Sequence, residues 1–72
     1  MITLAGITVV HNPARFTTML TDRNNDQVFE LDHGGLAINP GKIERTMLRA
    51  YRLGGTVGLL GCFGAEHIRL CP

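Results

Sequence analysis

Cysteine and histidine side chains near the C-terminus are the first candidates for chemistry, because both are common ligands of Zn²⁺. Cys62, His67 and Cys71 have the spacing C-x4-H-x3-C, and His33 could supply a fourth ligand. A structural zinc site usually starts from a close C-x2–4-C pair, which this chain does not have. We therefore interpret these residues as a buried Cys62, a surface His67 and a terminal Cys71, and we expect no metal or other cofactor.

The same residues could form a catalytic pair, with His67 activating the Cys62 thiol and Glu66 or an acidic residue further up the chain orienting the imidazole. Cys62, however, lies between Gly61 and Phe63, and an apolar setting disfavours the reactive thiolate. Serine is absent from the chain, and 72 residues leave little room for a pocket of about 300 Å³ or more. We expect no catalytic residue and no enzymatic activity.

Glycine recurs at every third position from residue 55 to residue 64, with mostly apolar residues between. This run lacks both the G-x-G-x-x-G and the G-x-x-x-x-G-K-[ST] phosphate-binding patterns. Its G-x-x-G steps are similar to the loop of KH-type single-strand binders, but that loop is polar and basic between its glycines. We interpret the run as structural: a buried strand bent by its glycines, or a segment where another backbone approaches closely.

A stripe of basic residues is the feature that most favours a binding function. Its members are spaced i, i+3, i+7 and i+10, which gathers them in a narrow arc of one helix face at 100° per residue. They are Lys42, Arg45, Arg49 and Arg52. Four cations so placed repel one another, and only Glu44 lies nearby on the same helix to offset them. Within the stripe, arginine outnumbers lysine three to one, and the planar guanidinium of arginine suits specific interfaces.

Two interpretations of this stripe stay open. It is either a solvated face or a patch that docks on an acidic protein surface or a phosphate backbone. The solvated face would form salt bridges to the acidic residues earlier in the chain, namely Asp22, Asp26, Glu30 and Asp32.

The stripe belongs to a helix that we predict over about residues 40–53. Asn39 is a favourable N-cap, and Pro40 suits the first helical position because its missing N–H would be unpaired there. Ile38 and Ile43 have the spacing of a hydrophobic staple. Gly54 is expected to adopt the left-handed conformation that ends the helix.

The side of this helix opposite the stripe is apolar and must pack on a sheet. Its members are Ile43, Met47, Ala50 and Tyr51. The rest of the chain is typical of short strands: residues 2–10 with a bulge at Gly6, residues 16–21 and 27–31 joined by an Asp- and Asn-rich hairpin loop, and residues 66–71.

The resulting order is β-β-β-α-β-β, with the glycine run counted as a strand. This order predicts an α+β fold in which one amphipathic helix packs on one face of a small, mostly antiparallel sheet. Seventy-two residues make one domain, spanning residues 1–72.

Charge is distributed unevenly along the chain. The net charge of +1 is the sum of −2 over residues 1–39 and +3 over residues 40–72. This dipole weakens any claim of general affinity for nucleic acid, which rests on surplus positive charge.

Compartment can be predicted from the cysteine usage and from the N-terminus. Two cysteines are fewer than a small secreted domain usually carries, which indicates reduced thiols and a cytoplasmic location. The N-terminus lacks the pattern of a signal peptide, and no apolar run approaches the roughly 20 residues of a bilayer span, so we expect no membrane association.

Together these features favour a non-enzymatic, protein-binding regulator or inhibitor. The expected partner is a larger protein with an acidic surface, and the expected contact residues are the four cations of the stripe. By analogy of size, the chain suits a phage-type modulator of a large host nucleic-acid-handling machine, such as RNA polymerase or a CRISPR effector. The alternatives are a small nucleic-acid-binding module, disfavoured because no aromatic residue interleaves with the cations, or a phage structural or assembly subunit. The oligomeric state stays open.

Overall fold

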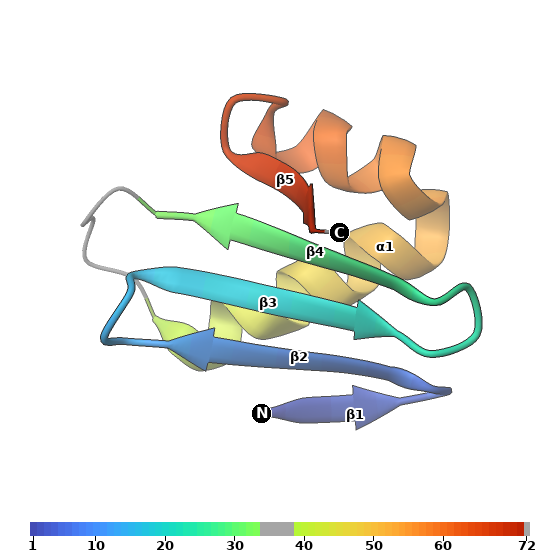
Figure 1. The fold of residues 1–72 in the computed structure, drawn as a ribbon, viewed down its shortest axis with the longest axis horizontal. Helices are drawn as coiled ribbons and strands as arrows, with labels where there is room; N and C mark the ends of the chain where they lie inside the picture. The colour runs from blue at the N-terminus through green and yellow to red at the C-terminus, as the bar shows by residue number, and fades with distance from the viewer. Residues whose placement is uncertain (34–38, 72) are drawn as a thin grey trace.

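The computed structural model describes residues 1–33 and 39–71, which form a five-stranded sheet and one helix (Figure 1). The strands are β1 (Ile2–Leu4), β2 (Ile7–Asn12), β3 (Thr17–Asp22), β4 (Gln27–Asp32) and β5 (Ile68–Cys71), and the helix α1 spans Pro40–Phe63. Neighbouring strands pair antiparallel in the order β1-β2-β3-β4-β5. The α+β class with one helix on one face is confirmed. The element order is β-β-β-β-α-β and not the expected β-β-β-α-β-β.

The segment expected to be one bulged strand is two strands joined by a tight turn. Ile2 pairs with Val9 and Leu4 with Ile7, so the chain reverses through only two residues. Ala5 and Gly6 both have positive φ, at 53° and 81°, as a type I′ hairpin turn requires. The change of alternation at Gly6 was therefore a reversal and not a bulge.

The next hairpin, between β3 and β4, has the expected position to within a residue at each end. Asp22 ends β3, and its carboxylate accepts hydrogen bonds from the Asn24 backbone N–H (2.9 Å) and the Asn25 side-chain amide (2.8 Å). These bonds are typical of the turns that aspartate and asparagine form.

Helix α1 starts where the sequence predicts. The Asn39 side chain accepts a hydrogen bond from the Lys42 N–H at 3.1 Å, and Pro40 is the first helical residue. The expected staple contact involves Ile38, which lies outside the described residues. The first helical segment ends within a residue of the predicted position, but the residue with positive φ at its end is Gly55 (φ 58°, ψ −139°) and not the expected Gly54. A second helical segment, which was not predicted from the sequence, follows the sharp break at Gly55 and ends at Phe63.

The break divides α1 into a first segment, residues 40–54, and a second segment, residues 56–63. The second segment doubles back beside the first (Figure 1). A Cβ atom at Gly58 would lie 2.2 Å from the Ala50 carbonyl oxygen, so only glycine allows the two backbones to approach this closely. The glycine run is therefore helical, and the expected strand is wrong; the alternative of a close backbone approach is confirmed at Gly58.

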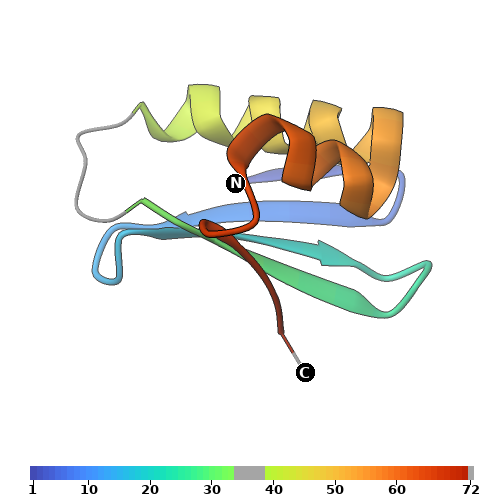
Figure 2. The same cartoon turned by 90° about the horizontal axis from the view of Figure 1, so that it is seen from above.

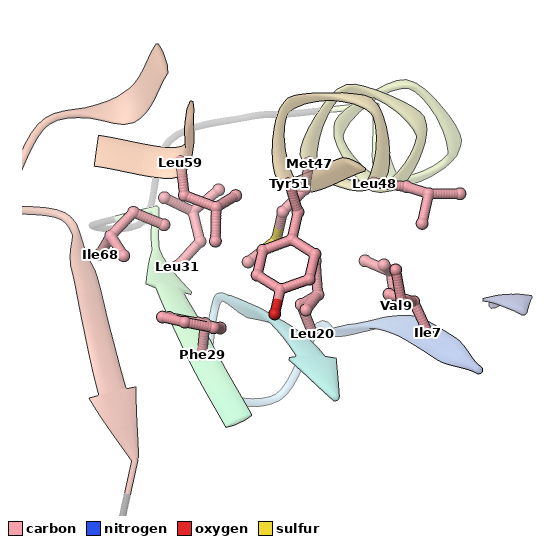
Figure 3. Close-up of a cluster of buried hydrophobic side chains, with 10 residues drawn as sticks. All are labelled: Ile7, Val9, Leu20, Phe29, Leu31, Met47, Leu48, Tyr51, Leu59 and Ile68. Carbon is pink, nitrogen blue, oxygen red and sulfur yellow. The ribbon is translucent and has the colours of Figure 1, made fainter. Parts of the chain in front are cut away.

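The core lies between the sheet and α1, which covers one face of the sheet (Figure 2). Figure 3 shows its buried side chains, which come from four strands and both helical segments: Ile7, Val9, Leu20, Phe29, Leu31, Met47, Leu48, Tyr51, Leu59 and Ile68. Ile43 and Ala50 are half-buried against this cluster. The predicted apolar side of the helix is thus confirmed.

The helix α1 does not cover the other face of the sheet (Figure 2), although Thr17 and Glu30, which strand alternation places on that face, are buried. Strand alternation and register place Thr8, Val10 and Thr21 on this face, with Val10 and Thr21 exposed. Within the described residues, no helix combines the length and the apolar character needed to cross a bilayer.

Candidate functional site

The basic face of α1 is the strongest candidate site, and we define it as Lys42, Arg45, Arg49 and Arg52. All four residues are exposed on the first segment, while Met47 and Tyr51 on the opposite side are buried. The structure therefore brings the four predicted contact residues together on one surface.

Polar contacts of two buried side chains, Glu44 and Tyr51, fix how the first segment is rotated about its axis. Near its start, the buried Glu44 carboxylate accepts a hydrogen bond from the His11 backbone N–H at 2.9 Å and pairs with the Met1 amino group at 3.2 Å. Near its end, the buried Tyr51 hydroxyl donates to the Asp22 carboxylate. With Met47 fully buried between them, these contacts hold the basic face toward solvent.

Glu44 was expected to offset the positive charge of the stripe, and it does not. At 100° per residue its side chain lies on the far side of the helix from the cations, and it is 5% exposed. The basic face consequently carries no carboxylate.

The expected salt bridges to the basic face are not formed. In residues 1–33 and 39–71, the ion pairs join Met1 to Glu44 and both Arg15 and Arg69 to Glu30. None of them includes a cation of the basic face. The interpretation of that face as internally salt-bridged is therefore wrong for the described part of the chain.

Several carboxylates are buried instead, and Glu30 lies on the sheet face away from α1, because it alternates along β4 with the core residues Phe29 and Leu31. Asp22, Glu30 and Glu44 are buried, whereas all seven lysine and arginine residues are exposed. The hydrogen bond from Tyr51, which outweighs burial, lowers the pKa of Asp22, so this carboxylate stays ionised inside the fold. Burial and the bond to Asp22 raise the pKa of Tyr51, so its hydroxyl keeps its proton. These three carboxylates are therefore not available to neutralise the basic face.

A buried polar cluster that sequence reasoning missed lies where β2, β3 and the end of β4 meet. The Thr18 hydroxyl contacts His33 Nε2 at 2.7 Å and His11 Nδ1 at 3.3 Å, and the two imidazole rings are 5.6 Å apart. Burial, followed by the neighbouring His11, lowers the pKa of His33, against an opposing effect of Asp32. Thr18 is fully buried and unreachable by a substrate, so the cluster acts as a structural tie. The cross-strand pairing of His11 with Thr18 was the available signal, and it requires the register.

The cysteine and histidine candidates are scattered. Cys62 is exposed near the end of α1, which corrects the expectation that it is buried. Cys71 is half-buried at the end of β5, and both cysteines are free thiols. His67 is exposed and lies 3.8 Å from Glu66. Within the described residues, no three cysteine, histidine or carboxylate side chains lie together as metal ligands.

Cavities of more than about 300 Å³ open on the described surface, contrary to the expectation that the chain leaves little room for one. One, of about 310 Å³, lies beside β5 and is lined by Glu30, Asp32, Ala65, Glu66, His67, Ile68 and Arg69. Another, of about 440 Å³, lies by the break in α1 and is lined by Ala5, Ile7, Asp22, Asn24, Asn25, Tyr51, Arg52 and Gly55. Small-molecule sites are mostly apolar with a few free polar groups. Here the linings are largely polar, and Glu30 and Asp22 are already paired within the fold.

The comparisons with known proteins add no functional assignment. A scan against protein-family models, a search of curated proteins and a search of solved structures found no match to this chain.

Proposed function

We propose that this protein is a non-enzymatic binding module, a regulator or inhibitor that occupies an acidic surface of a larger protein through its basic face. One observation carries the proposal: Lys42, Arg45, Arg49 and Arg52 are exposed together, and none has an anionic partner within the described residues. A phage-type modulator of a large host nucleic-acid-handling machine is one class of protein that would work in this way.

Electrostatics supports an acidic partner. Cations three or four residues apart on a helix are neighbours, and like charges at this spacing destabilise the helix slightly. Carboxylates on a partner would relieve that repulsion and would also accelerate association. Exposed pairs contribute only about 0–1 kcal/mol each, so these charges would act mainly on association rate and on the choice of partner.

Nucleic acid is the second candidate ligand. One observation makes it a stronger candidate than the sequence alone indicates. Asp22 of the β3–β4 hairpin is buried, so the exposed charge at the turn is Arg23 against Asp26 and would repel phosphate less than expected. Against it, the basic face has no aromatic side chain on which a base could stack. Tyr51, the aromatic residue of the first segment, is buried against Phe29.

We also propose a reducing compartment, such as the cytoplasm. The two free thiols, one of them exposed, support this proposal.

The test compares charge reversals on and off the basic face. The protein would be immobilised and incubated with a cell lysate, with and without nuclease treatment, and the captured molecules identified by mass spectrometry. Arg49→Glu reverses one charge within the basic face, and Arg23→Glu makes the same change at an exposed position in the β3–β4 hairpin. Both variants should fold, because exposed charges contribute only about 0–1 kcal/mol.

We expect a set of acidic proteins that survives nuclease treatment, is retained by Arg23→Glu and is lost from Arg49→Glu. Capture that disappears with nuclease would favour the nucleic-acid candidate. Equal capture by both variants would show that the basic face is only solvated.

A further inference from the structure

Apolar side chains are exposed on both sides of the break in α1. Leu53 and Val57 are 82% and 78% exposed, and Leu60, one turn after Val57, is 38% exposed. Single exposed apolar residues are common on protein surfaces, whereas a contiguous group marks an interaction site more often.

The break brings these residues next to the basic face. Leu53 follows Arg49 by four residues, a spacing that places them side by side on one helix face. Gly58 lies against the Ala50 carbonyl, so the second segment starts beside the end of the first. Leu53 therefore lies next to the cations of the basic face, and Val57 follows it directly across the break at Gly55.

Folding does not require these side chains. The second segment is anchored to the core by Leu59, which is fully buried, and by Phe63, which packs on the core cluster. The first segment is anchored by Met47 and Tyr51. Leu53 and Val57 are therefore not part of the hydrophobic core.

We propose that Leu53 and Val57 are the apolar anchors of the interface, and that the partner site is an acidic protein surface with apolar side chains set between its carboxylates. This inference rests on the proposed function and names the chemistry of the partner. Interfaces of this kind combine buried apolar anchors with arginine, and arginine is enriched in them relative to lysine. The charge of the basic face favours an acidic partner. Leu53 and Val57 favour a partner whose acidic surface also carries apolar side chains.

The other acidic ligands fit less well. A phosphate backbone would use the arginines and leave Leu53 and Val57 exposed to water. An anionic membrane surface would use both, but peripheral helices that bind membranes present a longer apolar face than two residues.

The test uses two synthetic peptide probes of equal length and charge. The first is a helix-forming peptide rich in glutamate with one stripe of leucines, and the second has glutamine at each leucine position. Binding would be measured by fluorescence anisotropy at about 150 mM salt, where the Debye length is about 8 Å. We expect the parent protein to bind the leucine peptide about tenfold more tightly than the glutamine peptide, the scale set by burying one or two apolar side chains.

Three variants locate the source of that preference. Leu53→Gln combined with Val57→Thr should bind both peptides almost equally, because the apolar contact is lost and the charges remain. Leu70→Gln alters an apolar residue on β5 that is 56% exposed, and it should keep the parent's preference. Arg45→Glu combined with Arg49→Glu should weaken binding to both peptides by at least tenfold.

The outcomes separate the two proposals. If the Arg45/Arg49 double variant binds both peptides as the parent does, the proposed function fails. If it loses binding while the Leu53/Val57 double variant keeps the parent's preference, the apolar anchors alone are wrong. Tighter binding to phosphatidylserine–phosphatidylcholine vesicles or to random single-stranded DNA than to the leucine peptide would overturn the acidic-protein partner.

Discussion

Single residues at the edges of the core hold the helix and the sheet together. The Tyr51 hydroxyl reaches Asp22 at one end, and Glu44 takes the His11 N–H and the Met1 amino group at the other. A buried polar group that loses its partner costs about 1–3 kcal/mol, more if it is charged. These contacts therefore decide the rotation of α1 and, through it, the direction of the basic face.

The buried His33 should make stability depend on pH. Its pKa is lowered in the fold, chiefly by burial, so its contribution to the free energy of unfolding is present above its unfolded pKa of about 6.5 and is lost as pH falls through the folded pKa. Urea denaturation at a series of pH values should show stability decreasing from about pH 7 toward pH 5.

The matched control for this experiment is His67, which is exposed. His33→Gln should flatten the pH dependence between pH 7 and 5, whereas His67→Gln should leave it in place. An unchanged slope in His33→Gln would mean that the buried cluster of His33, Thr18 and His11 does not control stability.

The Ala5–Gly6 turn offers a second test at the residue scale. Ala5 has a φ of 53°, and a type I′ turn favours asparagine at its first central position. Ala5→Asn should raise the free energy of unfolding by about 0.5–1 kcal/mol, and the β-branched Ala5→Val should lower it. Thermal melting would show opposite shifts of several degrees, since about 1 kcal/mol moves Tm by roughly 4–8 °C in a domain of this size. Equal shifts would show that the turn is not of this type.

At the scale of elements, the two segments of α1 depend on the absence of a side chain at Gly58. Gly58→Ala would place a Cβ against the Ala50 carbonyl, a backbone atom that cannot move aside. This change should destabilise the protein by about 1–3 kcal/mol and loosen the second segment. Gly61→Ala in the same segment meets no atom within 4 Å and should stabilise the protein by about 0.5–1 kcal/mol. Chemical denaturation that ranks the two variants in the reverse order would contradict the doubled-back helix.

The start of α1 was predictable from sequence because its signals are local. The Asn39 side chain accepts a hydrogen bond from an N–H group of the first turn, and Pro40 has no N–H group to leave unpaired. Neither effect depends on the rest of the chain. The face that packs on the sheet follows from the 3.6-residue period of Met47 and Tyr51 with their neighbours. The second helical segment was not predictable, because four glycines in ten residues oppose helix formation and only tertiary packing offsets their cost.

The errors at the Ala5–Gly6 turn and at Cys62 also arose from local sequence signals that were ambiguous. Alanine is not a typical first residue of a type I′ turn, so the reversal at Ala5–Gly6 resembled a bulge in one longer strand. Cys62 has apolar neighbours in sequence, but it is exposed near the end of α1, where Leu59 and Phe63 make the contacts with the core. Period 2 and period 3.6 cannot be told apart in a short apolar run, so the glycine run resembled a buried strand.

At the scale of the whole molecule, the positions of the cations were predictable and their pairing was not. Helical spacing alone gathers Lys42, Arg45, Arg49 and Arg52 on one face. Whether carboxylates reach that face depends on the sheet register and on which acidic residues are buried in the fold. The fold buries Asp22, Glu30 and Glu44 and pairs them elsewhere, so none of them neutralises the basic face.

Photo-crosslinking from defined surface positions tests the central claim, that the outer face of α1 is the contact surface, most directly. p-Benzoylphenylalanine would replace Thr46, which lies one turn after Lys42 and keeps all four cations, or Thr21, which is exposed on the uncovered face of the sheet. Each protein would be irradiated in nuclease-treated lysate and its adducts identified by mass spectrometry. We predict that position 46 forms an adduct with a captured acidic protein and that position 21 does not. An adduct with that protein from position 21 and none from position 46 would place the contact on the sheet and contradict the account.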